Sequence, residues 1–543
     1  MKIFEAEKYN IHENADNAEA FEQLIGIIKN TPGEKTLRLT DGIYEIHSEK
    51  LTAKKLFITN TAGDKEYLPE ETPHLQKTAL LFDGIKNLTV EGNGAVILIS
   101  GNTTNIAITD CENIHIDNLE IKHIHPDLHA IKVKEIGESF IDYTFDEDTL
   151  CKEITSVPCF YGPDYCYEVT AHKNNGYIGL IKSETPDKVE RVRHPFYNTT
   201  AVNLISDNTV RAYYDVLPEF DIGFEFYDYC VRRDTAGIFI DRSKNIRITG
   251  IKQRYNKSLA LVAQDSENIY VDKVEFSPEK GCPRKLCSLA DFFQFCMCRG
   301  KIAVTDSYFD GAGDDCLNVH GVHYRIKYIE ENTVTVCYCH DQTHGFNPLR
   351  KGDKIAFIDT ETLLEKGTAY ILDSKMLNEY DIELILDSTE GLSLDDAIED
   401  ISAIPEEFVF SGNTMTRIIT RGLLITMRGR AIVENNRFVS TTASGILLSD
   451  DANFWFESGM CLDVTIRNNI FDYCGETPIR ILPENKKHRG AVHKNITIEG
   501  NTFISHPPIL VTAKSTDNIT LSGNIYYDAK LIETVDCSNI SIL

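Results

Sequence analysis

The sequence predicts an all-β chain built on a right-handed parallel β-helix, with an N-terminal capping helix and two inserted small β-barrel-like modules. Three observations lead to this prediction. A short phrase of asparagine and alternating apolar residues recurs along the chain, it recurs at a nearly constant interval, and it stops twice where clustered strands replace it. A period of roughly 20–30 residues is typical of a β-solenoid.

The recurring phrase consists of a polar turn, an asparagine and a short run with period-two alternation. Successive asparagines step from 87 to 113, 245 to 268, 495 to 518 and 518 to 539, which gives spacings of 26, 23, 23 and 21 residues. Period-two alternation indicates strands with one buried face, and helical solenoid repeats are longer. We expect the asparagines to stack at one corner and satisfy backbone groups of the turns. The copies are KNLTVEG, ENIHIDN, KNIRITG, ENIYVDK, DVTIRNN, KNITIEG, DNITLSG and SNISIL.

The N-terminal segment predicts an amphipathic helix over residues 14–29, because Ala18, Phe21, Leu24 and Ile28 recur at helical spacing. Pro32 and Gly33 follow the segment and end the helix. A helix in this place covers the open end of a β-helix, whose edge strands would otherwise be exposed.

The two interruptions define the domain organisation. We predict the N-terminal cap and first coils at 1–124, module 1 at 125–234, coils with the catalytic candidates at 235–321, module 2 at 322–412, and the last coils at 413–543. Both inserts contain alternating strands, and structureless loops of that length are uncommon. Module 2 leaves the solenoid directly after the coil with the catalytic candidates, so we expect it to overhang the active face.

The bulk composition restricts the partners. The chain has 543 residues, 42% of them hydrophobic, and a formal net charge of −28, which argues against nucleic acid or an anionic membrane as a partner. No apolar run of about 18 residues predicts a membrane span. No secretory signal pattern is visible and the fifteen cysteines fit reduced thiols, so we expect a cytoplasmic protein, or a secreted or periplasmic one if a signal was removed. The pairs Cys296/Cys298 and Cys337/Cys339 lack zinc-site spacing, and we expect buried thiols.

The stretch from Ser288 to Gly321 carries the catalytic candidates Asp291, Asp314 and Asp315. Asp291 and Asp314 are 23 residues apart, about one coil, which places Asp291 beside the Asp314–Asp315 pair at the strand spacing of ~4.8 Å. Three such carboxyl groups cannot all ionise cheaply, so one should keep a proton at neutral pH. A proton donor beside ionised carboxylates is the equipment for glycoside hydrolysis.

A mechanism with inversion needs an acid and a base about 6.5–9.5 Å apart. We assign Asp314 as the general acid, because its two acidic neighbours should raise its pKa, and Asp291 and Asp315 as the joint base. The scheme requires no metal and no cofactor.

Six further residues are candidates for sugar binding, because aromatic faces bind sugar C–H surfaces and charged or imidazole groups bind hydroxyls. A structural role remains open for them. They are Arg299, His320, His344, Arg421, Trp455 and Glu457.

Three motifs, ADFFQFCMCRG, DGAGDDCLNVHG and SGILLSDDANFWFESG, together resemble glycoside hydrolase family 110, the bacterial α-1,3-galactosidases. The resemblance covers most of the chain. It implies an inverting exo-hydrolase that removes terminal α-1,3-linked galactose from blood-group B-type or linear Galα1,3Gal glycans. The family's catalytic aspartates fall on Asp291, Asp314 and Asp315, and the implied partner is a glycan with a terminal α-galactose.

Other functions remain open at this point. The aspartate pair alone also fits a polygalacturonase-like hydrolase, and a calcium-dependent lyase uses carboxylates as ligands. A non-catalytic glycan-binding solenoid is a further option. A homodimer is one option for the oligomeric state, which the sequence leaves open.

Overall fold

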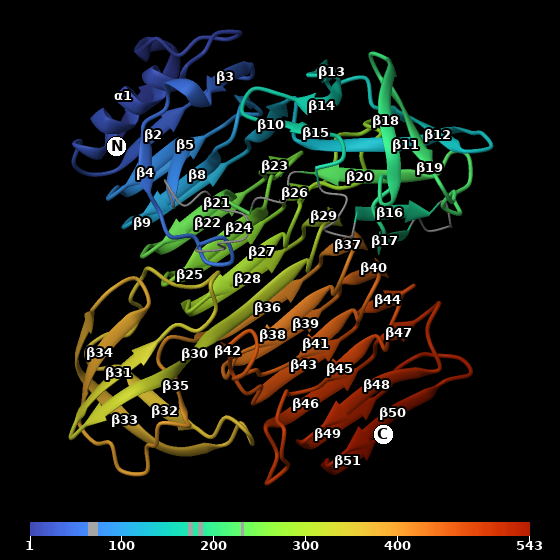
Figure 1. The fold of residues 1–543 in the computed structure, drawn as a ribbon. Coiled ribbons are helices and arrows are strands. Elements are labelled where there is room, and N and C mark those ends of the chain that lie inside the picture. Colours follow the sequence, from blue (N-terminus) through green and yellow to red (C-terminus); the bar gives the residue numbers. More distant parts are fainter. Residues whose placement is uncertain (63–73, 172–177, 183–187, 230–232) are drawn as a thin grey trace.

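The computed structural model describes residues 1–62, 74–171, 178–182, 188–229 and 233–543. A long parallel β-helix runs from the N-terminal to the C-terminal end of the molecule, and the two inserted modules project from it at separate places (Figure 1). Each coil contributes one strand to each of three walls, so residues one coil apart pair in parallel register.

The first wall is a 13-stranded parallel sheet that collects the asparagine phrases. Its strands, in spatial order, are β1 (Lys2–Glu5), β2 (Lys35–Arg38), β6 (Lys86–Glu91), β9 (Glu112–Asp117), β22 (Lys244–Thr249), β25 (Glu267–Asp272), β28 (Arg299–Thr305), β36 (Pro405–Ser411), β39 (Arg430–Glu434), β43 (Asp463–Arg467), β46 (His493–Glu499), β49 (Thr516–Ser522) and β51 (Ser538–Ile542).

The second wall is a 10-stranded parallel sheet. Its strands are β3 (Ile43–His47), β7 (Val96–Ser100), β10 (Glu120–Ile124), β23 (Lys252–Gln253), β26 (Glu275–Phe276), β29 (Tyr308–Ala312), β37 (Thr414–Ile418), β40 (Arg437–Thr441), β44 (Ile470–Asp472) and β47 (Thr502–Phe503).

The third wall carries the site described below. Its parallel strands are β5 (Leu75–Asp83), β8 (Thr104–Thr109), β21 (Ala236–Asp241), β24 (Leu259–Gln264), β27 (Phe293–Cys296), β30 (Leu317–Glu330), β38 (Leu423–Thr426), β41 (Ile446–Leu448), β45 (Ile479–Ile481), β48 (Ile509–Lys514) and β50 (Lys530–Val535). Two short strands, β4 (Ala53–Lys55) and β42 (Glu457–Ser458), pair antiparallel with β5 and β30.

Asparagines stack from coil to coil, as the repeat predicts. The side-chain amide of Asn113 donates to Asn87 Oδ1 at 2.7 Å, that of Asn245 donates to Asn113 at 2.9 Å, and that of Asn268 donates to Asn245 at 3.0 Å. These residues have φ between 55° and 58°, in the left-handed region that asparagine tolerates better than most residues. The asparagine of the phrase therefore turns the corner and ties neighbouring coils together.

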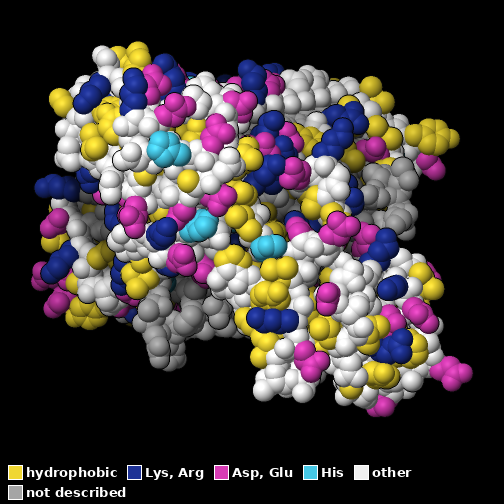
Figure 2. All heavy atoms as spheres, turned by 90° about the horizontal axis from the view of Figure 1, so that it is seen from above, with side chains coloured by type: hydrophobic (Ala, Val, Ile, Leu, Met, Phe, Trp, Pro, Cys, Tyr) yellow, Lys and Arg dark blue, Asp and Glu magenta, His cyan; other side chains and the backbone are white. Residues whose placement is uncertain are grey.

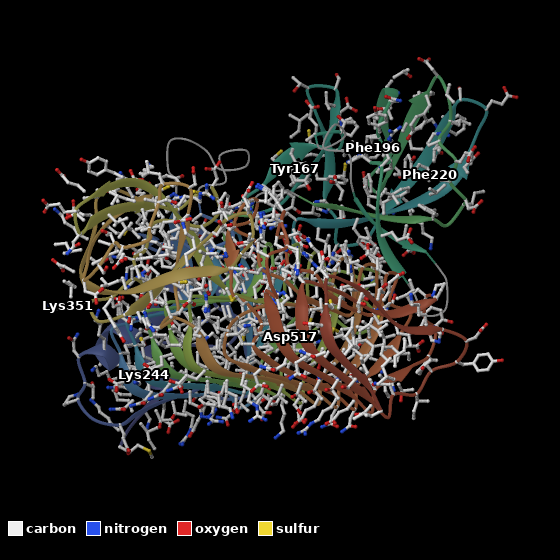
Figure 3. The ribbon with its side chains drawn as sticks, turned by 90° about the horizontal axis from the view of Figure 1, so that it is seen from below. Tyr167, Phe196, Phe220, Lys244, Lys351 and Asp517 are labelled. Carbon is white, nitrogen blue, oxygen red and sulfur yellow. The ribbon has the colours of Figure 1, made fainter. Side chains whose placement is uncertain are left out.

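The interior of the solenoid is apolar. Phe438, Phe471 and Phe503 stack on one another with ring centroids 4.8 and 5.1 Å apart, close to the strand spacing. The outer side chains of the first wall, Lys244 and Asp517 among them, face away from this interior (Figure 3). Alternating burial along strands of the first wall such as β6, β9 and β22 thus separates core from solvent.

The helix predicted near the N-terminus is α1 (Ala18–Lys29), and it buries Ala18, Phe21, Leu24, Ile25 and Ile28 against the first coils. It starts four residues later than residue 14, because Asp16 and Asn17 bond backbone groups of a turn and of the neighbouring strand. Two short 3-10 helices, η1 (Ala6–Tyr9) and η2 (Ser48–Lys50), accompany it.

Module 1 consists of two antiparallel sheets with an aromatic-rich core between them. Tyr167, Phe196 and Phe220 belong to that core, in the lobe that projects from the solenoid (Figure 3). The module differs from the expected barrel. Within its described residues, the two edge strands of the larger sheet do not pair with each other, so this sheet stays open, and the smaller sheet covers its apolar face. The larger sheet is β17 (Lys188–Val192), β16 (Ile178–Lys182), β20 (Glu225–Tyr229), β11 (Leu128–Ile136), β12 (Phe140–Phe145), β19 (Thr209–Tyr214) and β18 (Thr199–Ser206), and the smaller is β13 (Cys151–Ile154), β14 (Val157–Tyr161) and β15 (Cys166–Glu168).

Module 2 closes into an antiparallel barrel. Strand β30 leaves the third wall and continues into the module, and the pairings run from β30 through β31, β34, β33, β32 and β35 back to β30. The new strands are β31 (Thr333–Cys337), β32 (Lys354–Ile358), β33 (Glu365–Met376), β34 (Asp381–Leu386) and β35 (Ala397–Asp400). The first wall resumes with β36 at Pro405, before the expected boundary at residue 412.

The surface seen from above carries acidic and basic side chains that are interspersed rather than gathered by sign (Figure 2). In the described part of the chain, no helix has the length and apolar character needed to cross a membrane.

Candidate active site

The third wall places three charged residues at equivalent positions in consecutive coils. Asp291, Asp315 and Arg421 each stand two residues before the first residue of their strands, β27, β30 and β38. Backbone hydrogen bonds join these coils, from Phe292 N to Asp315 O at 3.1 Å and from Cys316 N to Arg421 O at 3.0 Å. Module 2 is inserted in the sequence between the second and third of these coils. Strands β30 and β38 nevertheless pair directly, so Asp291, Asp315 and Arg421 remain in consecutive coils.

Two arginines hold two of the three candidate aspartates. Arg421 donates to Asp315 Oδ1 from its backbone N at 3.0 Å and from Nε at 2.9 Å. Arg233 donates from its guanidinium to Asp314 Oδ2 at 3.1 Å. The Thr420 hydroxyl lies between the pair, 3.1 Å from Asp314 Oδ1 and in hydrogen-bond contact with Asp315 Oδ1. The two carboxyl groups are therefore fixed in orientation by charged and hydroxyl donors.

The third aspartate is buried among like charges. Burial raises the pKa of Asp291 well above its usual range, the Asp314 and Asp315 carboxylates raise it further, and Arg233 and Arg421 oppose both effects. Burial also raises the pKa of Asp315, whereas the bonded Arg421 guanidinium lowers it. The resting site therefore keeps a proton, as the sequence predicts, and burial among like charges favours Asp291 as the group that holds it. The physical reason is position: Asp291 is 4% exposed, whereas the Asp314 side chain is 21% exposed and touches Arg233.

These aspartates form the floor of a cavity of about 230 Å³. This volume is below that of a typical drug-sized pocket, and it suits a compact polar group. The residues that surround the cavity come from the third wall of the solenoid, the loop after β4, the C-terminal end of module 1, module 2 and the loop before β42. The lining residues include Asn60, Arg233, Gln294, Asn318, His320, Tyr338, Cys339, His340, Gln342, Thr343, Thr420, Arg421, Trp455 and Glu457.

One rim of the cavity is aromatic and is held by a carboxylate. Asp451 accepts hydrogen bonds from the backbone N of Asn453, Phe454 and Trp455 at 2.8, 3.1 and 2.7 Å. The Trp455 ring stacks on His340 of module 2 at 4.7 Å and remains 47% exposed. An aromatic face held open in this way is suited to the apolar face of a sugar ring.

Another part of the cavity lining is a polar network on β27, β30 and β42. Gln294 Nε2 lies 2.6 Å from His320 Nε2, and Asn318 Nδ2 donates to Glu457 Oε1 at 2.9 Å. The Glu457 carboxylate also lies 3.8 Å from the His320 ring. Fixed amide, imidazole and carboxylate groups of this kind can bind several hydroxyls of one ligand.

Comparison with known proteins gives consistent relatives over nearly the whole chain. The chain is 31% identical over 522 residues to α-1,3-galactosidase A of Bacteroides thetaiotaomicron, covering 93% of this chain and 90% of that protein. It is 32% identical to α-1,3-galactosidase A of Bacteroides fragilis over 513 residues, covering 91% and 82%, and 30% identical to that of Akkermansia muciniphila over 499 residues, covering 90% and 81%. The chain belongs to the α-1,3-galactosidase family.

Two family descriptions match parts of this α-1,3-galactosidase family member. "Right handed beta helix region" matches residues 386–526, and "GLAA-B beta-barrel domain II" matches residues 333–398. The second match coincides with the closed barrel of module 2. The right-handed β-helix expected from the sequence is therefore confirmed.

Four of the six predicted sugar-binding residues lie in the cavity of this α-1,3-galactosidase family member, and two do not. His320, Arg421, Trp455 and Glu457 line it together with the three aspartates. Arg299 lies elsewhere, because it begins β28 of the first wall and binds Asp353 of module 2 at 2.7 Å. His344 lies behind the cavity wall, with its ring against Tyr380 at a centroid distance of 4.2 Å. The prediction that Arg299 and His344 contact sugar is therefore not supported.

Several residues that line the cavity were not predicted from the sequence. Arg233 comes from the C-terminal end of module 1, after β20, Asn60 from the loop after β4, and Gln294 from β27. Asn60 Oδ1 accepts a hydrogen bond from Arg233 at 3.2 Å, so the loop reaches the arginine that holds Asp314. Gln294 and Thr420 had a usable signal, since each lies within a few residues of a stacked candidate, but no periodic signal marks Arg233 or Asn60.

One cysteine also differs from expectation. Cys337 is buried as predicted, but Cys339 is exposed and lines the cavity, because β31 ends at Cys337 and the chain then turns outward. The two sulfur atoms lie 3.7 Å apart, and the hydrogen bond with the Cys337 thiol lowers the pKa of Cys339 to about 7.

Proposed function

We propose that the protein is an exo-acting, inverting glycoside hydrolase that releases terminal α-1,3-linked galactose from blood-group B-type or linear Galα1,3Gal glycans. The observation that carries this proposal is the stack of Asp291, Asp315 and Arg421 on the floor of a walled cavity, with Asp314 beside it. The names of the relatives, α-1,3-galactosidases A and B, supply the sugar and the linkage.

The arrangement supports a division of labour within the aspartate trio. We assign Asp314 as the acid that protonates the glycosidic oxygen, because it is the most exposed of the three toward the cavity. Asp315, whose ionised form is stabilised by Arg421, and Asp291 then activate the attacking water. Closely coupled carboxyl groups share their protons, so the resting proton that burial favours on Asp291 can pass to Asp314 when substrate docks. Once the proton is on Asp314, Asp291 is ionised, and the raised pKa of Asp291 makes it a stronger base toward the attacking water.

The walls of the cavity support exo action. Module 2, the loop after β4 and the Trp455 loop rise around the aspartates, so the cavity accepts the end of a glycan more readily than its middle. Arg233 is bonded to Asp314, and Arg421 is bonded to Asp315. Because both guanidinium groups already hold an aspartate of the site, they are not placed to bind the carboxylate of a uronic acid, which disfavours a polygalacturonase-like substrate.

The test is sugar release followed by NMR of the fresh product. The panel is Galα1,3Gal, the blood-group B trisaccharide, Galα1,4Gal and polygalacturonate. We expect galactose from the first two only, with the β-anomer appearing first. Release of α-galactose first would mean retention of configuration, and release from polygalacturonate alone would overturn the substrate assignment.

A further inference from the structure

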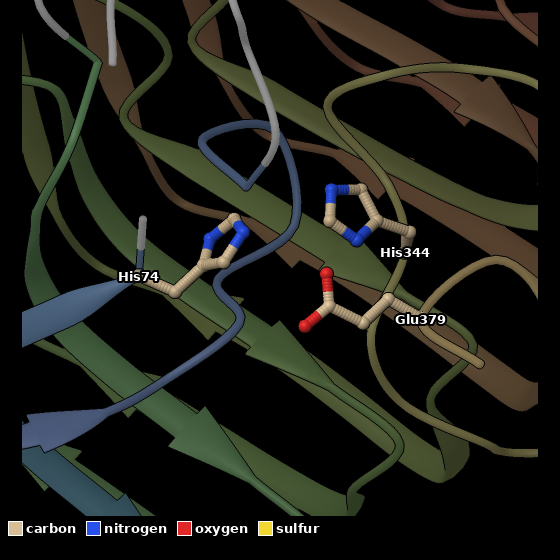
Figure 4. A group of neighbouring side chains, drawn as sticks. All are labelled: His74, His344 and Glu379. Atoms are coloured by element: carbon tan, nitrogen blue, oxygen red, sulfur yellow. The ribbon is translucent and has the colours of Figure 1, made fainter. Parts of the chain in front are cut away.

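Three metal-binding side chains converge behind the cavity wall. His74 stands at the start of β5, His344 lies in the module 2 segment after β31, and Glu379 lies in the turn between β33 and β34. One ligand atom of each lies within 4.8 Å of the others. Figure 4 shows the three side chains reaching toward a common point from separate parts of the chain.

The composition of this cluster matches a known ligand set. Two imidazoles and one carboxylate form a three-ligand zinc site with an open position. Bond lengths of about 2.0–2.1 Å around a tetrahedral ion place ligand atoms roughly 3.3 Å apart, so the cluster must contract by about 1.5 Å at most. Glu379 is exposed and lies in a turn, which gives it the freedom to make most of that movement.

The two imidazoles are held in position by aromatic rings. Phe57 packs on His74 with centroids 4.3 Å apart, and Tyr380 stacks on His344 at 4.2 Å. His74 is 5% exposed and His344 is 1% exposed. Rings that are already fixed in place lower the entropic cost of binding an ion.

One cation already contacts the cluster. Lys55 donates to Glu379 Oε1 at 2.7 Å, and its side chain is 51% exposed. Exposed ion pairs of this type contribute little, so the lysine can move into solvent when a divalent ion arrives. The second carboxylate oxygen of Glu379 is free of this contact.

The cluster joins two parts of the cavity wall. The loop after β4 touches the module 2 segment next to His344: Asn60 N donates to Gln342 O at 2.6 Å, and the Thr59 and Thr343 hydroxyls lie 3.0 Å apart. Asn60, Gln342 and Thr343 line the cavity. We propose that His74, His344 and Glu379 bind a divalent transition-metal ion of the zinc class, and that the ion clasps the loop after β4 to module 2.

The test uses the full chain, stripped with EDTA and titrated with ZnCl₂ and separately with CoCl₂. We expect one equivalent bound in the wild type and at least a 100-fold loss of affinity in His74→Ala and Glu379→Gln. Because the chain has fifteen cysteines, the cobalt spectrum decides the ligands: the proposed site gives d–d bands without thiolate charge-transfer absorption. The matched control is His115→Asn, which removes a histidine from the first wall and should bind as the wild type does.

Hydrogen exchange tests the clasp. Zinc should slow backbone exchange in residues 56–62 and 340–344 of the wild type and leave exchange in Glu379→Gln unchanged. This variant alters an exposed side chain, so its fold should persist even if His74→Ala misfolds. Equal binding in the wild type and Glu379→Gln would overturn the metal site, and binding without altered exchange in these segments would overturn the clasp. Neither result depends on the proposed glycosidase activity.

Discussion

Replacing Arg421 by methionine isolates the charge that holds Asp315. The substitution keeps the backbone hydrogen bond to Asp315 Oδ1 and removes the Nε bond at 2.9 Å. A hydrogen bond to a charged group contributes about 1.5–3 kcal/mol. At 1.36 kcal/mol for each pKa unit, the loss corresponds to a rise of about 1–2 units in the pKa of Asp315. The Arg421 side chain is 30% exposed, so solvent screening favours the lower end, about 1 unit.

The sign of the change follows from the role of Asp315 as a base. Arg421 lowers the pKa of Asp315, so without it the carboxylate is protonated at a higher pH. The acidic limb of the kcat/KM profile on Galα1,3Gal should therefore move to higher pH by about 1 unit. Arg421→Lys keeps a charge without the Nε geometry and should give a smaller shift. Arg430→Met, at an exposed site on the first wall, is the matched control and should leave the limb in place. An acidic limb that stays fixed in Arg421→Met, or moves to lower pH, would refute the reasoning.

Three further predictions concern the acid, the cavity thiol and the solenoid. Asp314→Asn should lower kcat on Galα1,3Gal by about 10²–10⁴-fold, but by far less on an aryl α-galactoside, because that leaving group needs no proton. Asp291→Asn should lose activity on both substrates. Equal losses on both substrates in Asp314→Asn would mean that another residue is the acid. Cys339 should react with iodoacetamide at pH 7–8 faster than the buried thiols, and the reaction should inactivate the protein more slowly when galactose is present. Cys339→Ser should resist this inactivation. An unchanged rate of inactivation in that variant would show that Cys339 is not the thiol responsible. Asn469→Ala should lower the free energy of unfolding, measured in urea, by about 3 kcal/mol or more, because it leaves the buried hydrogen-bond partners of Asn469 unsatisfied. Asn518→Gly, at the exposed corner, should lower it by well under half as much. Similar losses in the two variants would mean that burial of the stacked asparagines contributes nothing.

The buried ladder behind the last prediction is a feature that the repeat only partly revealed. The exposed asparagines at the start of each phrase were predicted to stack, and they do. A second ladder of buried asparagines runs inside the other corner, where Asn436 bonds Asn469 at 3.0 Å and Asn469 bonds Asn501 at 3.0 Å. Asn469 ends the phrase DVTIRNN and Asn501 directly follows KNITIEG, but the inward direction of these side chains depends on the turn that each coil makes.

The repeat period was sufficient to place Asp291 beside the Asp314–Asp315 pair, and the strand register then aligns it with Asp315. In a parallel solenoid, residues one coil apart are neighbours whatever the rest of the chain does, so spacing in sequence becomes distance in space. The same reasoning applies to the buried face of α1, because helical periodicity decides that face locally. The barrel of module 2 was predictable from four alternating strands with turn residues between them, since adjacent strands in sequence usually pair.

Sequence alone thus determined the right-handed β-helix, the place of its inserts and the aspartate trio, because each depends on contacts between neighbouring coils or neighbouring strands. Only the tertiary structure decided that burial raises the pKa of Asp291, that Arg233 and Asn60 enter the cavity, and that Arg299 and His344 lie outside it. Those outcomes depend on the paths of loops and modules over the solenoid and on the burial they create. Neither leaves a period in the sequence, so neither can be read from spacing.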